Sequence, residues 1–194
     1  MVLLQLLLAL APLDPDAFAR DLAKSGAANV RVRRVQLDRD PELEAIVQWE
    51  MPDTGAHAAV LDPAAPAWRE LARFNTWWSY LPADGQRLIE TRPLVDPAVQ
   101  DLLVRVKSGE TEHVRHTLTL YRLRDGKLRP VLEIKESETA MEHPSGDVFT
   151  TTAAVDFAPG RVTVRSKREP GGRTACALHV WNEDRFRFDE RPCD

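Results

Sequence analysis

From Val30 almost to the end of the chain, apolar and polar residues alternate with the period of two that is typical of half-buried β-strands. Between Phe149 and Phe157, for example, the larger apolar residues all fall on one face. Short polar turns separate the alternating runs. Asp125-Gly126 is a strong hairpin signal, because this pair adopts positive φ angles at little cost. The pattern predicts an all-β protein of about seven to twelve antiparallel strands.

The strand pattern occurs three times, over residues 31–74, 87–135 and 148–190. The centres of the second strands, Val47, Val104 and Val164, are 57 and then 60 residues apart. Repeated units of this kind stack so that each covers the apolar face of its neighbour. We therefore expect three four-stranded antiparallel meanders that resemble propeller blades, within one domain over residues 12–194. Residues 75–86 and 137–146 are expected to be the linkers between them.

One short helix is predicted before the strands, over residues 14–26. Asp14 suits the N-cap, Pro15 suits the first turn, and Gly26 suits the position after the last turn. Phe18 and Leu22 share one face at helical spacing. The helix is expected to cap the first meander.

An acidic stretch, residues 35–43, lies between the first two expected strands of segment one. Gln36, Asp38, Asp40 and Glu42 alternate there in front of an apolar strand. This layout, with the blade-like repeats, resembles the FG-GAP or VCBS repeats of integrin-alpha-like β-propellers. The resemblance implies calcium bound by Asp38, Asp40 and Glu42, because Ca²⁺ prefers several oxygen ligands on a flexible loop. The alternative is a solvated acidic turn between two strands.

Three blades do not close a propeller, because closed propellers have four or more. Either the meanders form an open array capped by the N-terminal helix, or another chain completes the ring. The oligomeric state stays open at this point.

The first eleven residues form an apolar run that is interrupted only by Gln5. The run is too short to cross a bilayer, which takes about 20 apolar residues, so no transmembrane segment is expected there. It is typical of the hydrophobic core of a secretory signal peptide, with Ala9-Leu10-Ala11 as the cleavage site. The alternative is a buried N-terminal strand or helix. We expect a secreted or periplasmic protein.

The two cysteines lie on the two arms of the last expected hairpin, whose turn falls near Asn182. Antiparallel pairing brings Cys176 and Cys193 within about two positions of each other, close enough for a disulfide. An oxidising compartment outside the cytoplasm would preserve the bond. The alternative is a pair of unrelated small residues with free thiols.

The composition, with 29% charged and 43% hydrophobic residues, fits a globular protein. The formal net charge of −4 argues against nucleic acid as a partner, because phosphate binding requires a clustered positive surface.

Three aromatic residues in the first expected linker, Trp77, Trp78 and Tyr80, are the candidate ligand-binding residues. Exposed aromatic rings beside polar groups bind sugar rings or peptides. The alternative is that these rings fill the seam between the first two meanders.

Two further groups of residues are candidates for chemistry. His113 and His116 are three positions apart on an expected strand, which directs them to opposite faces. This argues against a shared metal and favours two exposed histidines. Glu133, Glu136, Glu138 and Glu142 gather around His143, where paired carboxylates suggest a hydrolase. Since they follow a strand into a polar stretch, a solvated charge run is the simpler interpretation. The sequence contains no nucleophile elbow, phosphate loop or zinc motif, so no catalytic residue is assigned.

These patterns together predict an exported, non-enzymatic binding or structural module whose partner is a protein or a glycan. Two alternatives remain. One is a carboxylate-based hydrolase with a cleft between sheets, and the other is an orphan subunit that completes a larger propeller.

Overall fold

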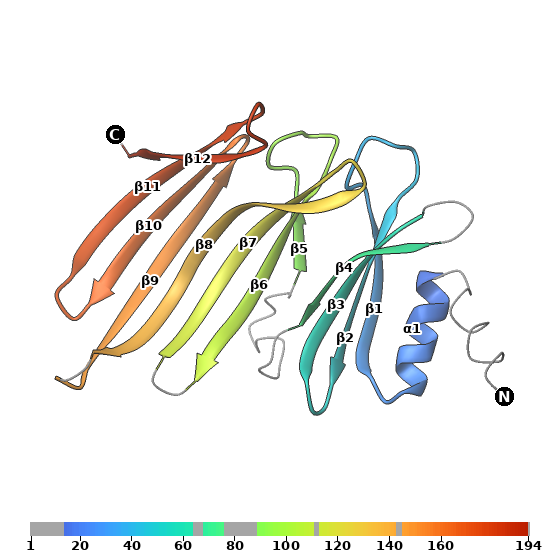
Figure 1. Ribbon diagram of the computed structural model, residues 1–194, viewed down its shortest axis with the longest axis horizontal. Helices are drawn as coiled ribbons and strands as arrows, with labels where there is room; N and C mark the ends of the chain where they lie inside the picture. Colours follow the sequence, from blue (N-terminus) through green and yellow to red (C-terminus); the bar gives the residue numbers. More distant parts are fainter. Residues whose placement is uncertain (1–13, 64–67, 76–88, 111–112, 143–144, 194) are drawn as a thin grey trace, which may run out of the picture.

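The computed structural model describes residues 14–63, 68–75, 89–110, 113–142 and 145–193. Within them, one helix is followed by strands that pair antiparallel with their neighbours in chain order, in two separate sheets (Figure 1), which confirms the predicted all-β class. The elements are α1 (Pro15–Lys24), β1 (Ala28–Val35), β2 (Glu44–Met51), β3 (Gly55–Asp62), β4 (Arg69–Asn75), β5 (Ile89–Arg92), β6 (Asp101–Glu110), β7 (His113–Arg124), β8 (Lys127–Glu142), β9 (Asp147–Ala158), β10 (Arg161–Glu169), β11 (Arg173–Asn182) and β12 (Arg187–Pro192).

The strands form two sheets. The first contains β1 to β4 in chain order, and the second contains β5 to β12, also in chain order. The prediction of three separate four-stranded sheets is therefore wrong. The described strands also do not close into a propeller, since β5 and β12 end the larger sheet.

The error lies in residues 137–146, which the polar sequence predicted as a linker. Strand β8 continues through this stretch to Glu142, and it pairs with β9 from Ser137 opposite Thr152 to Glu142 opposite Asp147. Threonines face one another at Thr139 and Thr150, and β-branched residues favour extended strands. Cross-strand pairing thus replaces the linker and joins the second and third segments into one sheet.

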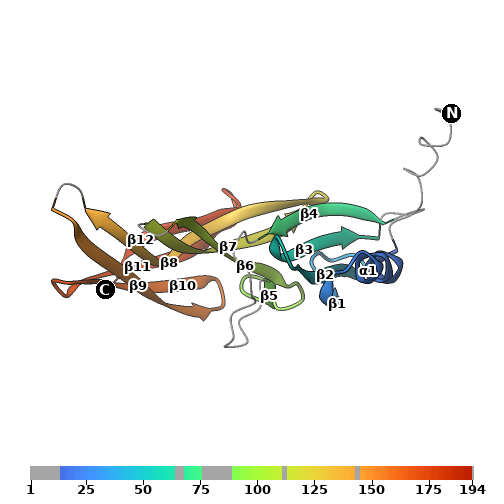
Figure 2. The same cartoon turned by 90° about the horizontal axis from the view of Figure 1, so that it is seen from below.

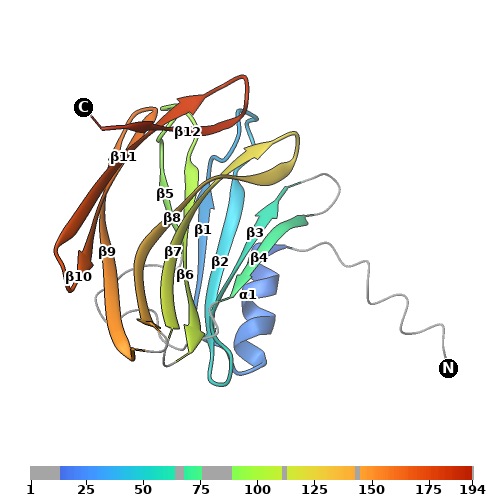
Figure 3. The ribbon, with the colours of Figure 1, turned by 60° about the vertical axis from the view of Figure 1, so that its left-hand side comes forward.

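The large sheet curves because β8 and β9 pair over only this short stretch. The earlier part of β8 pairs with β7 alone, and the later part of β9 pairs with β10 alone. Figure 3 shows the resulting curvature from β5 round to β12. Apolar side chains fill the space between the two arms of this curved sheet.

Three hydrophobic clusters hold these layers together, and burial of each large aliphatic side chain contributes about 1.5–3 kcal/mol. The first lies between α1 and the four-stranded sheet, and Phe18 meets the ring of Trp49 edge-on there, at 5.8 Å between centroids. The second joins the four-stranded sheet to β5, β6 and β7 around Ile46 and Leu102. The third lies between β6, β7 and β8 on one side and β10 and β12 on the other, around Leu118 and Val162.

The molecule is consequently a row of layers with α1 at one end and the β9–β12 hairpins at the other (Figure 2). The helix is the one predicted. The Asp14 side chain accepts the Asp16 N–H at the N-cap, Pro15 begins the first turn, and Gly26 follows the last turn with a φ of 91°.

Candidate functional site

A cluster of three carboxylates lies where the loop between β1 and β2 enters β2. Oxygens of Asp38, Asp40 and Glu44 all lie within 4.8 Å of one another. Glu44 is the first residue of β2 and is 0% exposed. Its Oε2 accepts the backbone N–H of Leu37 at 2.7 Å, whereas its Oε1 is buried and has no hydrogen-bond partner in the part of the chain that the structure describes. A buried carboxylate therefore lies beside two further acids.

The loop itself is held in shape by hydrogen bonds of its own. The Gln36 side-chain amide donates to the carbonyl oxygens of Asp38 and Asp40, at 2.9 and 2.6 Å. The Asp38 carboxylate accepts the Asp40 N–H, and the Asp40 carboxylate accepts the Glu42 N–H, both at 2.9 Å. The Gln36 side chain thus stabilises the turn, and the two aspartates stabilise the same turn by side-chain-to-backbone hydrogen bonds that are typical of Asp.

The predicted metal ligands are brought together only in part. Asp38 and Asp40 lie in the cluster, but Glu42 does not, and Glu44 takes the third position. The prediction placed ligands on every second residue. In the structure the third acid is Glu44, the first residue of the strand. Its side chain is buried under the loop and accepts the N–H of Leu37. An all-oxygen donor set of carboxylates is the one that Ca²⁺ prefers.

Burial dominates the electrostatics of this cluster. It raises the pKa of Glu44 from 4.5 to about 7. The hydrogen bond from Leu37 lowers this pKa, whereas the negative charges of Asp38 and Asp40 raise it further. Burial also raises the pKa of Asp38, and the neighbouring Asp40 charge contributes. A cation at this place would reverse both effects by favouring the ionised carboxylates.

A second loop, between β5 and β6, has the same arrangement of a buried acid and a backbone amide. Asp101, the first residue of β6, is 1% exposed and accepts the N–H of Leu94 at 2.9 Å and of Val95 at 3.2 Å. Leu94 follows Leu37 by 57 positions, and Asp101 follows Glu44 by the same 57. In both loops the carboxylate of the acid accepts a hydrogen bond from the backbone amide seven residues before it.

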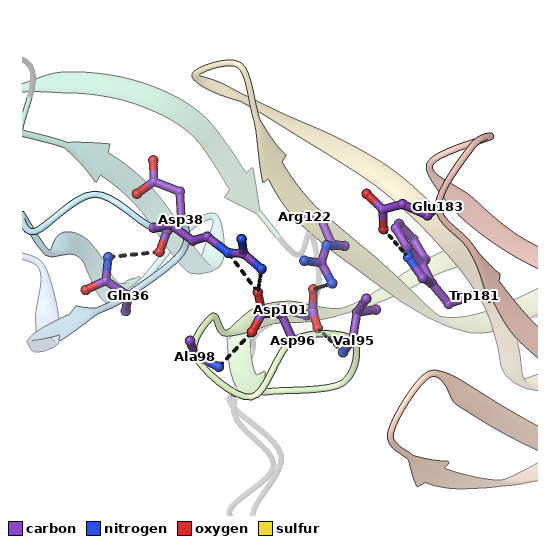
Figure 4. Close-up of polar contacts among 10 residues, drawn as sticks. Gln36, Asp38, Val95, Asp96, Ala98, Asp101, Arg122, Trp181 and Glu183 are labelled. Atoms are coloured by element: carbon purple, nitrogen blue, oxygen red, sulfur yellow. Dashed lines mark hydrogen bonds and ion pairs between the residues drawn. The ribbon is translucent and has the colours of Figure 1, made fainter.

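The second loop carries its own positive charge. Arg122 Nη1 forms an ion pair with Asp101 Oδ1 at 3.2 Å, and the Arg122 side chain is largely buried. Its guanidinium lies 5.0 Å from the centroid of the Trp181 ring, and Figure 4 shows Arg122 between Asp101 and Trp181. Burial raises the pKa of Asp101, and the Arg122 charge opposes that rise.

The two loops contact each other across the boundary between the sheets. Arg39 donates to Asp96 Oδ2 through Nε at 3.0 Å and through Nη2 at 2.7 Å. The backbone N–H of Gln100 donates to the carbonyl of Gln36 at 2.8 Å. Asp96 also accepts the N–H of Ala98 (Figure 4), and this bond and the Arg39 contact lower the pKa of Asp96. The loops therefore form one continuous polar region.

When the first two repeated segments are aligned without a gap, the sequence indicates that Glu44 is a loop residue equivalent to Asp101. Leu37 to Val47 and Leu94 to Val104 are both ten residues apart, which places Glu44 over Asp101. Arg122 had no such signal, because nothing in the alternation of β7 indicates that it reaches the loop.

The other predicted site residues are distributed as follows. Trp77, Trp78 and Tyr80 lie outside the described residues. Cys176 and Cys193 form a disulfide, with 5.7 Å between their Cα atoms. His113 and His116 lie on strand β7, and His113 contacts Glu138 at 2.8 Å.

Two of the four suspected acids, Glu136 and Glu138, are ion-pair partners of basic residues, and His143 lies outside the described residues. Glu136 accepts from Arg105, and Glu138 accepts from Lys135, His113 and Arg115. These donors lower the pKa of Glu138 to about 2, which is the opposite of what a general acid requires.

A scan against protein-family models, a search of curated proteins and a search of solved structures found no match for this chain. In the described part of the chain, no helix has the length and apolarity required to cross a bilayer.

Proposed function

We propose that the chain is an exported, non-enzymatic binding or structural module, and that Asp38, Asp40 and Glu44 bind a calcium ion that fastens its first loop. The observation that carries this proposal is the contrast between Glu44 and Asp101. They stand 57 positions apart and close their loops in the same way. Among the described residues, an arginine pairs with the buried oxygen of Asp101 and none pairs with Glu44.

A buried carboxylate is costly unless a positive charge or hydrogen bonds compensate it. Arg122 supplies that charge to Asp101. Among the described residues no lysine or arginine forms an ion pair with Glu44, and its nearest acidic neighbours add negative charge. A bound divalent cation is the group that would balance three carboxylates at one place. Backbone carbonyls and water would complete the six to eight oxygens that Ca²⁺ takes.

Export is supported by two features that are independent of the loop. The apolar first eleven residues are typical of a signal peptide, and the Cys176–Cys193 disulfide is of the kind that persists in oxidising compartments. Calcium sites in extracellular modules have dissociation constants of about 0.1–1 mM. A loop with three carboxylates on the outer side of a membrane fits that range.

The binding partner is proposed to be a protein or a glycan. The equal 57-residue spacing of the two loops suggests that one unit was duplicated, and duplicated β-units commonly serve as binding scaffolds. The absence of any catalytic motif in the sequence supports a non-enzymatic role. Probing a glycan and peptide array with the purified chain would identify the ligand.

The calcium site is tested by the melting temperature with and without about 10 mM calcium. A site with a dissociation constant near 0.1 mM would stabilise the fold by about 2.7 kcal/mol, which is about 5–10 °C for a domain of this size. The Glu44→Gln variant should lose the calcium-dependent rise. Glu42→Gln is the matched control, because Glu42 is in the same loop but outside the cluster, and it should keep the rise. An unchanged melting temperature in the native chain would reject the site.

A further inference from the structure

The last four strands bury much less apolar surface than the strands near the helix. We call β9 to β12, residues 147–192, the C-terminal arm. In the described part of the arm, Val162 and Phe188 are the apolar side chains that are buried. Val155 packs against the same cluster but is only partly buried. In β2 and β3, by contrast, most apolar side chains between residues 45 and 61 are buried. The arm is therefore the part of the fold with the weakest hydrophobic stabilisation.

The arm holds together as one unit. Strands β9, β10, β11 and β12 each pair with the next along the chain. The disulfide between Cys176 and Cys193 also joins β11 to the segment that follows β12. These contacts lie within the arm, so they do not depend on where the arm sits against the rest of the molecule.

The arm joins the rest of the large sheet at one end of β9. Residues 147–152 of β9 pair with residues 137–142 of β8, and the remainder of β9 pairs with β10 alone. A pocket of about 240 Å³ lies at this junction, lined by residues of β8, β9 and β10. The packing at the junction therefore leaves free space, and the short pairing of β8 with β9 can act as a hinge.

A second connection lies at the opposite end of β9. The backbone N–H of Gly160, in the turn between β9 and β10, donates to the carbonyl of Leu94 at 2.5 Å. The guanidinium of Arg92, at the end of β5, lies 5.1 Å from the centroid of the Phe157 ring. This end of β9 is thus fastened to the loop between β5 and β6.

Two further arginines of β7 contact aromatic rings of the arm. The Arg122 guanidinium lies 5.0 Å from the Trp181 ring (Figure 4), and that of Arg124 lies 4.6 Å from the Phe186 ring. Together with Arg92 and Phe157 they make three contacts, each between an arginine outside the arm and an aromatic ring within it. The side chains of Arg92 and Arg124 are about half exposed, so their contacts contribute little singly.

We propose that the C-terminal arm opens as one unit, with the β8–β9 pairing as its hinge and the three arginine–aromatic contacts as the closure. Units with few buried apolar contacts open before the whole chain unfolds. Opening separates the arm from the apolar face around Leu118 and Leu120 of β7, which it covers in the closed state. The proposal goes beyond the proposed function and is independent of the calcium site.

Hydrogen exchange of the full chain, followed by mass spectrometry of its peptides, tests the proposal. Amides of β10 and β11 should exchange together, at least about tenfold faster than those of β2 and β3. Exchange of the arm should also depend less steeply on added urea, because opening exposes less surface than complete unfolding. Equal rates and equal urea dependence in both regions would mean that the arm opens only when the whole chain unfolds, which would overturn the proposal.

Variants of the closure test the role of the arginines. The double variant Arg92→Met with Arg124→Met should speed exchange of the arm by about tenfold, because two contacts that hold it closed are lost. Arg165→Met is the matched control. Arg165 is exposed and pairs with Asp156, and both residues lie on the arm, so this contact persists when the arm opens. Unchanged exchange of the arm in the double variant, or equal acceleration by Arg165→Met, would contradict the closure.

A variant at the opposite end of the molecule separates opening of the arm from complete unfolding. Leu22 of α1 packs against the four-stranded sheet, far from the arm (Figure 2). Leu22→Ala should therefore speed exchange of β2 and β3 and leave exchange of the arm unchanged. Equal acceleration of both regions would overturn the proposal.

Discussion

Arg39 and Asp96 tie together two loops that belong to different sheets. Two nitrogens of the Arg39 guanidinium donate to one Asp96 oxygen, at 3.0 and 2.7 Å, and the residues are 57 positions apart. The Arg39 side chain is 81% exposed, whereas that of Asp96 is 16% exposed. The contact therefore spans the boundary between the sheets at the surface.

The Arg39→Ala variant should lower the free energy of unfolding only slightly, because exposed ion pairs contribute little and salt screens them. Urea unfolding at low and high ionic strength measures this effect. The difference from the native chain should shrink as salt is raised. A loss of several kcal/mol would mean that the loops depend on this contact far more than its exposure suggests.

Arg122→Met should be much more destabilising, by about 3 kcal/mol, because it leaves the Asp101 charge buried without its cation. Adding Asp101→Asn to this variant should recover part of the loss by removing that charge. Arg124→Met is the control. Arg124 also lies over an aromatic ring, that of Phe186, but it is exposed and has no buried acid beside it. Equal unfolding free energies for Arg122→Met and Arg124→Met would contradict the importance of the Asp101 pair.

Loss of the disulfide should destabilise the end of the large sheet. Cys176 and Cys193 are 17 residues apart, and a cross-link of about this loop length stabilises by about 3 kcal/mol in the loop-entropy description. The double variant Cys176→Ser with Cys193→Ser should therefore unfold at lower urea, and reducing agent should affect the native chain alone. Thiol titration of the denatured, unreduced protein should find no free thiol.

Acid should weaken the contacts of Glu138. Its pKa lies at about 2 in the folded protein against 4.5 for the ordinary side chain, chiefly because of Lys135, His113 and Arg115. A lowered carboxylate pKa gives stability that is present above pH 4.5 and is lost as the pH falls toward 2.

Because the partners of Glu138 are partly exposed, we expect this contribution to be about 1–2 kcal/mol. The Glu138→Gln variant should be less stable than the native chain at pH 6 by that amount. Near pH 2 the two should converge. A difference that stays constant from pH 6 to pH 2 would argue against ionic contacts as its source.

The sequence predicted the strands well, because alternation reflects burial directly. Val47, Val104 and Val164 do lie on the second strands of successive hairpin groups, β2, β6 and β10. Composition is misleading at residues 137–146, where Glu138 and Glu142 suggest a solvated loop. Whether a polar stretch is a strand or a loop depends on its partners on a neighbouring strand. Alternation along one strand does not identify those partners.

The candidate site was predicted only in part for a similar reason. Asp38 and Asp40 follow from the alternating acids, but the replacement of Glu42 by Glu44 depends on the loop folding back over the start of β2. The contact of Arg122 with Asp101 joins residues from separate strands. Neither the place of Glu44 in the cluster nor the Arg122–Asp101 contact can be predicted from the spacing of residues along the sequence.

Calorimetric titration of calcium into the purified chain shows whether Glu44, Asp38 and Asp40 together bind a cation. We predict one calcium ion per chain, binding that is retained in Glu42→Gln, and binding that is abolished in Glu44→Gln. No heat of binding in the native chain, or equal binding in both variants, would contradict the claim.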